Sequence, residues 1–127
     1  MADINISVSI TASKAAVASG GTVAGSASKS GLTVAMTGNR IADVYQIISN
    51  SEETLLKGDV GTMGYVYLEN LDNAITITIR SVTATAGSNF CILAPGQCAL
   101  FPSGQTALYA IAASGTTAVL HALICEA

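Results

Sequence analysis

Hydrophobic and polar residues alternate along residues 4–10. Ile4, Ile6, Val8 and Ile10 fall on one side of an extended chain, and Asn5, Ser7 and Ser9 fall on the other. A period of two residues is typical of a strand with one buried face. The pattern therefore predicts a half-buried β-strand over residues 4–10.

The alternation ends at residue 11. Residues 11–31 are mainly Ala, Ser, Gly, Thr and Lys, and they contain almost no large apolar side chain with which to build a core. We expect residues 1–31 to form an N-terminal strand and a flexible, extended arm, followed by a domain over residues 32–127. Two alternatives remain open. Either residues 4–10 add to the sheet of a neighbouring subunit while the arm docks there or on another protein beneath it, or they pair within their own subunit and residues 11–31 are a loop.

Short strands follow each other closely from Leu32 onward. In residues 74–80, Ile75, Ile77 and Ile79 alternate with polar residues, which predicts that the three isoleucines face the core. Residues 65–68 are apolar on both faces, so we expect a strand covered by a second sheet and by a partner subunit. The strands are predicted over residues 32–37, 42–49, 64–70, 74–82, 89–94, 97–101, 106–113 and 117–125.

Glycine, proline, asparagine and aspartate separate these strands, and Pro95-Gly96 suits the centre of a type II turn. Only residues 50–57 have local helical character, and a loop is equally compatible with them. Many short strands without a helical spacer indicate a sandwich or barrel. The predicted fold is all-β: an antiparallel, jelly-roll-like β-sandwich with an extended N-terminal arm.

Charged residues are scarce in this sequence. They make up 10% of the 127 residues, compared with about 25% in ordinary soluble domains, and the net charge is −3. A surface of Ser, Thr, Ala and Gly loses little hydration energy on contact, which favours a protein that works inside an assembly. The five cations are scattered, so we expect no nucleic-acid partner. The chain has no apolar run long enough for a membrane span and no signal-peptide pattern, so we expect no membrane partner and synthesis in a cytoplasm.

Residues with catalytic or metal-binding chemistry are few. The single histidine, His121, lies in an apolar strand, where a packed or interface role is the usual one. Glu69 and Asp72 flank a turn and raise the alternative of a calcium site, although local backbone hydrogen bonds explain them more simply. Cys91, Cys98 and Cys125 are expected to be small buried hydrophobic residues, with a Cys91–Cys98 disulfide as the alternative. We therefore expect no enzyme, no cofactor and no metal site.

Amphipathic side chains are the remaining candidates for recognition. Tyrosines on strands commonly form core or subunit contacts. With abundant Ala and few charges, they predict a homo-oligomer, most simply a homotrimer. The candidate subunit-contact residues are Tyr65, Tyr67, Tyr109, Ile4, Ile6 and Val8.

The second half of the chain has a recognisable series of strands and turns. It consists of residues 64–72 (GYVYLENLD), 93–101 (LAPGQCALF), 108–113 (LYAIAA) and 118–126 (AVLHALICE). Over residues 60–127 this resembles small virion structural proteins of tailed bacteriophages, namely capsid decoration (cement) proteins and related head and tail proteins. The sequence departs from that pattern at Ala74-Ile75, where a more polar loop is expected. The resemblance implies a non-enzymatic oligomer that binds the major capsid protein or another virion protein, in a virion assembled in the host cytoplasm.

Other functions remain as alternatives. The chain is also compatible with a tail, head–tail connector or fibre-associated structural protein. A β-sandwich module that binds host sugars would need an exposed cluster of aromatic and carboxylate groups, which the sequence barely supplies. A cupin-like enzyme would need several histidines for its metal, and the chain has one.

Overall fold

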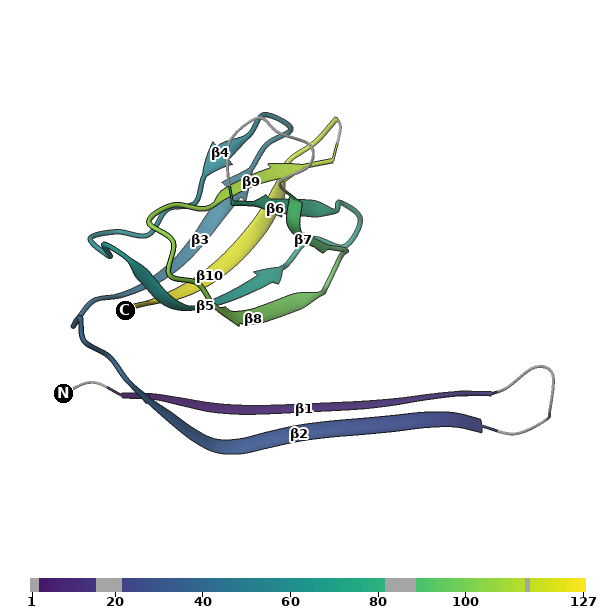
Figure 1. Cartoon of the computed structure of the whole chain (residues 1–127). Helices are drawn as coiled ribbons and strands as arrows, with labels where there is room; N and C mark the ends of the chain where they lie inside the picture. The colour runs from purple at the N-terminus through teal and green to yellow at the C-terminus, as the bar shows by residue number, and fades with distance from the viewer. Residues whose placement is uncertain (1–2, 16–21, 82–88, 114) are drawn as a thin grey trace. The chain divides into compact units, whose positions relative to one another are not determined.

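The computed structural model describes residues 3–15, 22–81, 89–113 and 115–127. These residues form ten β-strands and no helix, and all strand pairs are antiparallel, as the sequence predicted. The chain divides into two compact units, Met1–Ala35 and Met36–Ala127 (Figure 1). Each unit is described below by itself.

The first unit is a long β-hairpin. Strand β1 (Asp3–Ala15) pairs with β2 (Thr22–Ala35) from Asp3–Ala35 at one end to Ala15–Thr22 at the other. Residues 4–10 therefore pair within their own chain, although with residues of the hairpin and not with a strand of the second unit. The expectation of a loop over residues 11–31 is wrong for 11–15 and 22–31, which are strands, and residues 16–21 lie outside the described part. Residues 11–15 and 22–31 are mainly Ser, Thr, Ala and Gly, so they show no hydrophobic periodicity. They still form strands, because the main-chain hydrogen bonds of the ladder do not require large side chains.

A β-bulge in β2 aligns the two strands. Ile6 pairs with Leu32 and Val8 pairs with Lys29, so one residue of β1 faces two residues of β2, Ser30 and Gly31. Gly31 has a φ of 66°, which glycine adopts without the steric cost of a Cβ atom. The extra residue changes which side chains of β2 share a face with those of β1.

The second unit contains two four-stranded sheets. The first has the order β3-β10-β5-β8, and the second has the order β4-β9-β6-β7 (Figure 1). In chain order the strands are β3 (Ile41–Ile48), β4 (Glu53–Thr54), β5 (Met63–Asn70), β6 (Ile77–Arg80), β7 (Asn89–Leu93), β8 (Cys98–Pro102), β9 (Tyr109–Ala112) and β10 (Ala118–Glu126).

The strand pairs of this unit are nested. Strand β6 pairs with β7, β5 with β8, β4 with β9 and β3 with β10. The first four strands thus pair with the last four in reverse order, like the two arms of one long hairpin. The additional pairs β5–β10 and β6–β9 join neighbouring parts of that hairpin side by side into the two sheets. Every described connection between consecutive strands, apart from β6–β7, crosses from one sheet to the other.

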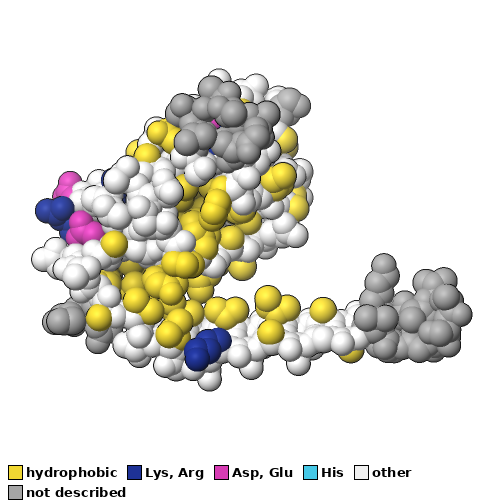
Figure 2. Space-filling model, viewed as in Figure 1, with side chains coloured by type: hydrophobic (Ala, Val, Ile, Leu, Met, Phe, Trp, Pro, Cys, Tyr) yellow, Lys and Arg dark blue, Asp and Glu magenta, His cyan; other side chains and the backbone are white. Residues whose placement is uncertain are grey.

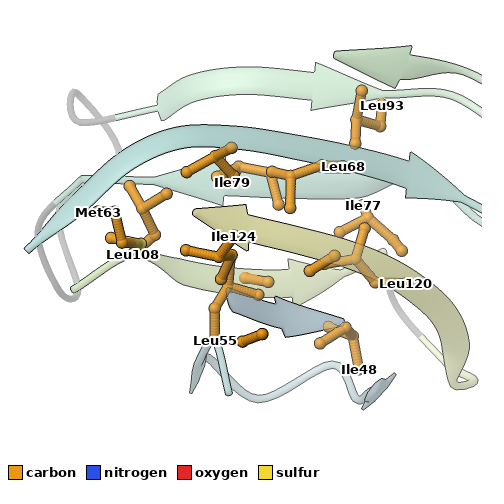
Figure 3. Packing of buried hydrophobic residues seen from close by; sticks show 14 of the residues in the cluster. Ile48, Leu55, Met63, Leu68, Ile77, Ile79, Leu93, Leu108, Leu120 and Ile124 are labelled. Atoms are coloured by element: carbon orange, nitrogen blue, oxygen red, sulfur yellow. The ribbon is translucent and has the colours of Figure 1, made fainter. Parts of the chain in front are cut away.

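The hydrophobic core lies between the two sheets, with side chains from both pointing into it (Figure 3). The predicted inward positions Ile77 and Ile79 are fully buried, and Ile75 is half-buried against the same cluster. Val66 and Leu68 of β5 are also fully buried. Alternation in the sequence therefore identified the core face of β6. Residues 65–68 are apolar on both faces, so the structure was needed to show that Val66 and Leu68 point inward.

Most predicted strands of the second unit agree with the structure to within a few residues. Two differences stand out. Residues 74–76 precede β6 instead of belonging to it, and the last predicted residue of that strand, 82, lies outside the described part. Residues 50–57 contain the two-residue strand β4 and no helical turn. Asp72 explains the first difference, because its Oδ1 accepts hydrogen bonds from the backbone N–H groups of Ala74 and Ile75, both at 2.7 Å.

Asn70 is a buried polar residue in the core, with no exposed surface. Its Nδ2 donates to the carbonyl oxygens of Ile75 at 2.8 Å and Leu93 at 2.9 Å, and its Oδ1 accepts from the N–H of Asp72 at 3.0 Å. One amide side chain thus connects the end of β5 with the residues before β6 and with the end of β7. Because all three bonds are made, the burial of this amide is compensated.

Replacing Ile77 with Ala should lower the free energy of unfolding by about 2–5 kcal/mol, because the change removes buried methyl groups and leaves a cavity. Chemical denaturation measures the difference. Thr78→Ala, at the neighbouring half-buried position, is the matched control and should change stability much less. An unchanged stability of Ile77→Ala would show that Ile77 is not in the core.

Replacing Asn70 with Ala should cost about 2–4 kcal/mol, because two buried carbonyl groups lose their donor and one N–H loses its acceptor. The control is Asn73→Ala at an exposed position nearby, for which we expect a change within about 0.5 kcal/mol. Both values come from denaturant unfolding. Equal effects of the two substitutions would contradict the connecting role of Asn70.

Candidate subunit-contact surfaces

The hairpin has one apolar face and one polar face. The pairs Ile10–Ala27 and Ala12–Gly25 lie on the same face as Val8. Ser9–Ser28, Thr11–Ser26 and Asn5–Thr33 lie on the opposite face, where Thr33 Oγ1 donates to Asn5 Oδ1 at 3.0 Å. Without the bulge, Ser28 and Ser30 would lie opposite the apolar side chains of β1. The bulge therefore gives the ribbon a continuous apolar face, which we define by the following residues: Ile4, Ile6, Val8, Ile10, Ala12, Ala27, Lys29, Leu32 and Val34.

Part of this hairpin face is exposed. The exposed fraction is 41% for Val8 and 62% for Ile10, whereas Ile6 is buried and Ile4 is half-buried. A shallow, mainly apolar hollow of about 180 Å³ lies between the two strands here, lined by Val8, Ile10, Ala27, Ser28 and Lys29. An isolated two-stranded hairpin is only marginally stable in water. Contact with another surface at this face would therefore stabilise the ribbon.

The sheet β3-β10-β5-β8 carries a second exposed apolar surface, on the side away from the core. Along β3, buried or half-buried positions alternate with exposed ones, so every second residue points outward. Tyr45 and Ile47 are each 65% exposed. On the side of the molecule that Figure 2 shows, hydrophobic side chains also reach the surface in several places, with few charged ones among them. We define the outer sheet face by its outward residues: Ile41, Asp43, Tyr45, Ile47, Tyr65, Tyr67, Glu69, Cys98, Leu100, Val119, His121 and Leu123.

His121 lies at the centre of the outer sheet face. Its ring stacks on Tyr45, with 4.4 Å between the centroids and 7° between the planes, and Tyr67 approaches it edge-on at 5.9 Å. Nε2 of His121 lies 2.6 Å from Oδ1 of Asp43. These contacts join three strands, β3, β10 and β5. The cluster therefore holds the aromatic rings in fixed positions on the surface of the sheet.

Two carboxylates give this face its negative charge. Asp43 is exposed next to His121, and Glu69 Oε2 accepts a hydrogen bond from the Tyr67 hydroxyl at 3.3 Å. Desolvation, followed by the charge of Glu69, raises the pKa of Tyr67, so this hydroxyl stays neutral and donates. The outer sheet face thus combines apolar and aromatic groups with two acidic ones.

The predicted contact residues do not all lie together. Tyr65 and Tyr67 are half-buried on the outer sheet face, Tyr109 is half-buried on β9 in the other sheet, and Ile4, Ile6 and Val8 belong to the hairpin. Sequence reasoning did not select Tyr45 and Asp43. The alternation along residues 41–47 would have identified Tyr45, because Ile41, Tyr45 and Ile47 share the exposed side of the strand and are large and apolar. It carries no comparable signal for Asp43 on the same side.

The three cysteines are free thiols. Cys125 is buried and Cys91 is half-buried, and burial raises the pKa of both. The expectation of burial is wrong for Cys98, which is exposed because the alternation along β8 turns it outward, opposite Glu69. The alternative of a Cys91–Cys98 disulfide is likewise not realised.

Glu69 and Asp72 have separate partners. Glu69 accepts from Tyr67, whereas Asp72 makes the local backbone bonds that the sequence predicted. Those bonds lower the pKa of Asp72, with Ala74 N–H the largest cause. Among the residues that the structure describes, no group of three or more His, Cys, Asp and Glu side chains is placed to hold a metal ion. Nor does this part of the chain contain a helix long and apolar enough to cross a membrane.

Glu126, at the end of β10, fixes the residues that lead into β3. Its Oε1 accepts from the N–H of Gly61 and its Oε2 from the N–H of Asn39, both at 3.1 Å, and the Arg40 guanidinium lies 3.6 Å away. The Gly61 bond is the largest cause that lowers the pKa of Glu126, and the Asn39 bond and the Arg40 charge act in the same direction. This carboxylate therefore stabilises the fold in its ionised form.

Comparisons with protein-family models, curated proteins and solved structures find no match for this chain. The two apolar faces and the residues that form them are therefore the features from which the function of this chain can be inferred.

Because the pKa of Glu126 is lowered in the folded protein, the stability of the protein should depend on pH. The stabilisation is complete above the pKa of an unfolded glutamate, about 4.3, and is lost as the pH falls through the lower folded-state value. Glu126→Gln should be less stable than the wild type at pH 7, and this difference should shrink between about pH 5 and pH 3. Thermal unfolding across this range measures the effect. Asp59→Asn, which removes a carboxylate at an exposed position nearby, is the matched control. A difference for Glu126→Gln that persists at pH 3 would contradict this role.

Proposed function

We propose that the chain is a non-enzymatic virion structural protein, and specifically a capsid decoration (cement) protein that assembles as a homotrimer on a shell of major capsid protein. The observation that supports this most directly is the pair of exposed apolar faces, one on the hairpin and one on the sheet β3-β10-β5-β8. Contiguous exposed apolar surface is typical of protein–protein contact sites. The few charged residues lower the cost of desolvating such contacts.

We further propose that the second unit is a jelly roll. Its eight strands pair in nested order and form the sheets β3-β10-β5-β8 and β4-β9-β6-β7. A jelly roll is a hairpin of this kind wound into two facing four-stranded sheets, and it recurs in viral capsid and lectin domains. Fold alone does not determine function. A jelly-roll fold agrees with the resemblance to phage virion proteins. The support for the specific decoration role comes from the surfaces of the chain.

The hairpin suits a protein that clamps neighbouring subunits. Strand β1 has 13 residues, so the ribbon is about 40 Å long at 3.3 Å per residue. That length exceeds the width of a single four-stranded sheet, about 20 Å. A decoration protein stabilises a shell by bridging subunits, and a long ribbon with one apolar face provides the reach and the contact area for that role.

Virus particles produced by cells that carry this gene provide the test. Mass spectrometry of the purified particles should detect the chain in many copies, and cryo-electron microscopy should show three-fold density on the outer shell. Light scattering of the purified chain should give three times the monomer mass. Density at the tail or at the head–tail junction would replace the decoration role by the alternative structural role. Absence of the chain from particles would overturn the proposal.

A further inference from the structure

We infer that the apolar face of the hairpin from one copy packs on the outer sheet face of a second copy, and that each copy donates one hairpin and receives one. This inference rests on the proposed role as a self-assembling subunit and specifies its contact. The proposed contact differs from sheet addition through strand 4–10, the alternative that the sequence left open. It uses the apolar side chains of the hairpin face, whereas the main-chain groups on one edge of β1 already pair with β2.

Charge favours the hairpin as the occupant. The outer sheet face carries Asp43, which is 62% exposed, and Glu69, whereas the apolar face of the hairpin carries Lys29. Two outer sheet faces in contact with each other would bring like charges together in a poorly solvated interface, which is unfavourable. A hairpin in the same place brings a lysine to the two carboxylates. The whole sequence follows this division, because Met1–Ala35 contains two lysines and one aspartate, whereas the second unit contains three cations and seven acidic residues.

The dimensions of the two faces match. A two-stranded ribbon is about 10 Å wide, and its apolar stretch from residue 4 to residue 12 is about 30 Å long, with the part from Val8 to Ala12 exposed. The strands β3, β5 and β10 have eight or nine residues, so the receiving sheet is about 27–30 Å long and about 20 Å wide. Sheets pack face to face at about 10 Å with interdigitating side chains. A ribbon that engages its whole apolar stretch, Ile4 and Ile6 included, would cover about half of the receiving face along its full length.

Reciprocal donation doubles the contact area of each copy. One ribbon face of about 10 by 30 Å is much smaller than the roughly 800 Å² per partner that a specific interface buries. A copy that both donates and receives buries two such contacts, about 600 Å² of projected area, and a closed ring of copies leaves no donor or acceptor unused. The receiving face is also prepared for contact, because the Tyr45–His121 stack and its Asp43 partner hold the rings in place before binding.

The experiment uses one defective donor and one defective acceptor. Ile10→Glu places a charge on the apolar face of the hairpin, and Ile47→Glu places one on the outer sheet face. Both positions are exposed, so neither substitution should unfold the protein. Each variant alone should weaken self-association at least about tenfold in analytical ultracentrifugation, because the charge is desolvated on contact. An equimolar mixture should associate more tightly than either variant alone but less tightly than the wild type. The normal hairpin of Ile47→Glu meets the normal acceptor of Ile10→Glu, whereas the reciprocal contact carries both charges.

The controls are matched by position. Thr11→Glu adds the same charge to the polar face of the hairpin, and Ile92→Glu adds it to an exposed isoleucine of β7 in the other sheet. Both controls should associate like the wild type. Circular dichroism verifies that all four variants are folded. A mixture that remains as dissociated as its components would overturn the inference, as would a monomeric wild type, in which the hairpin contacts its own subunit or nothing.

The two proposals fail separately. If the chain is present in virus particles but the mixed variants do not associate, the virion role stands and the hairpin exchange is wrong. If the mixture associates but the chain is absent from particles, the hairpin exchange stands and the virion role is wrong.

Discussion

The nested antiparallel pairing of β3–β6 with β7–β10 is the constraint on which the second unit depends. Each pair joins residues that are far apart in the sequence, except β6 and β7, so the core closes only when the outer pair β3–β10 is in place. Pairings of this kind carry a high cost in loop-closure entropy. The cost is offset by one continuous apolar cluster, to which both sheets contribute and in which Asn70 makes the polar connections.

The same pairing creates the outer sheet face. Once Leu120, Ala122 and Ile124 point into the core, the alternation of a strand turns His121 and Leu123 outward, and the neighbouring strands add Tyr45 and Tyr67 beside them. A register slip of one residue would exchange the two sets. The core and the candidate contact surface are therefore fixed together, and a rigid sheet presents the aromatic cluster.

The hairpin also has an apolar face and a polar face, but here a β-bulge produces them. Its second strand has no regular alternation of large apolar residues, and a bulge at Ser30–Gly31 brings Ala27 and Lys29 onto the face of Val8 and Ile10. The result is a ribbon that is amphipathic but has little apolar area of its own. In the proposed assembly, the ribbon gains stability from the surface it contacts, and the division of charge between hairpin and domain selects that surface.

Sequence alone determined the all-β class, most strand positions of the second unit and the inward set of residues such as Ile77 and Ile79. Periodicity and turn residues are local, so they are readable without a partner strand. Only the tertiary structure decided that residues 4–10 pair with 27–34, that β3 lies beside β10, and that Asp43, Tyr45, Tyr67 and His121 meet. Strand pairing is a long-range competition among hydrogen-bond ladders and buried faces. Alternation fixes which side of a strand is apolar, but it does not specify which strand lies beside it.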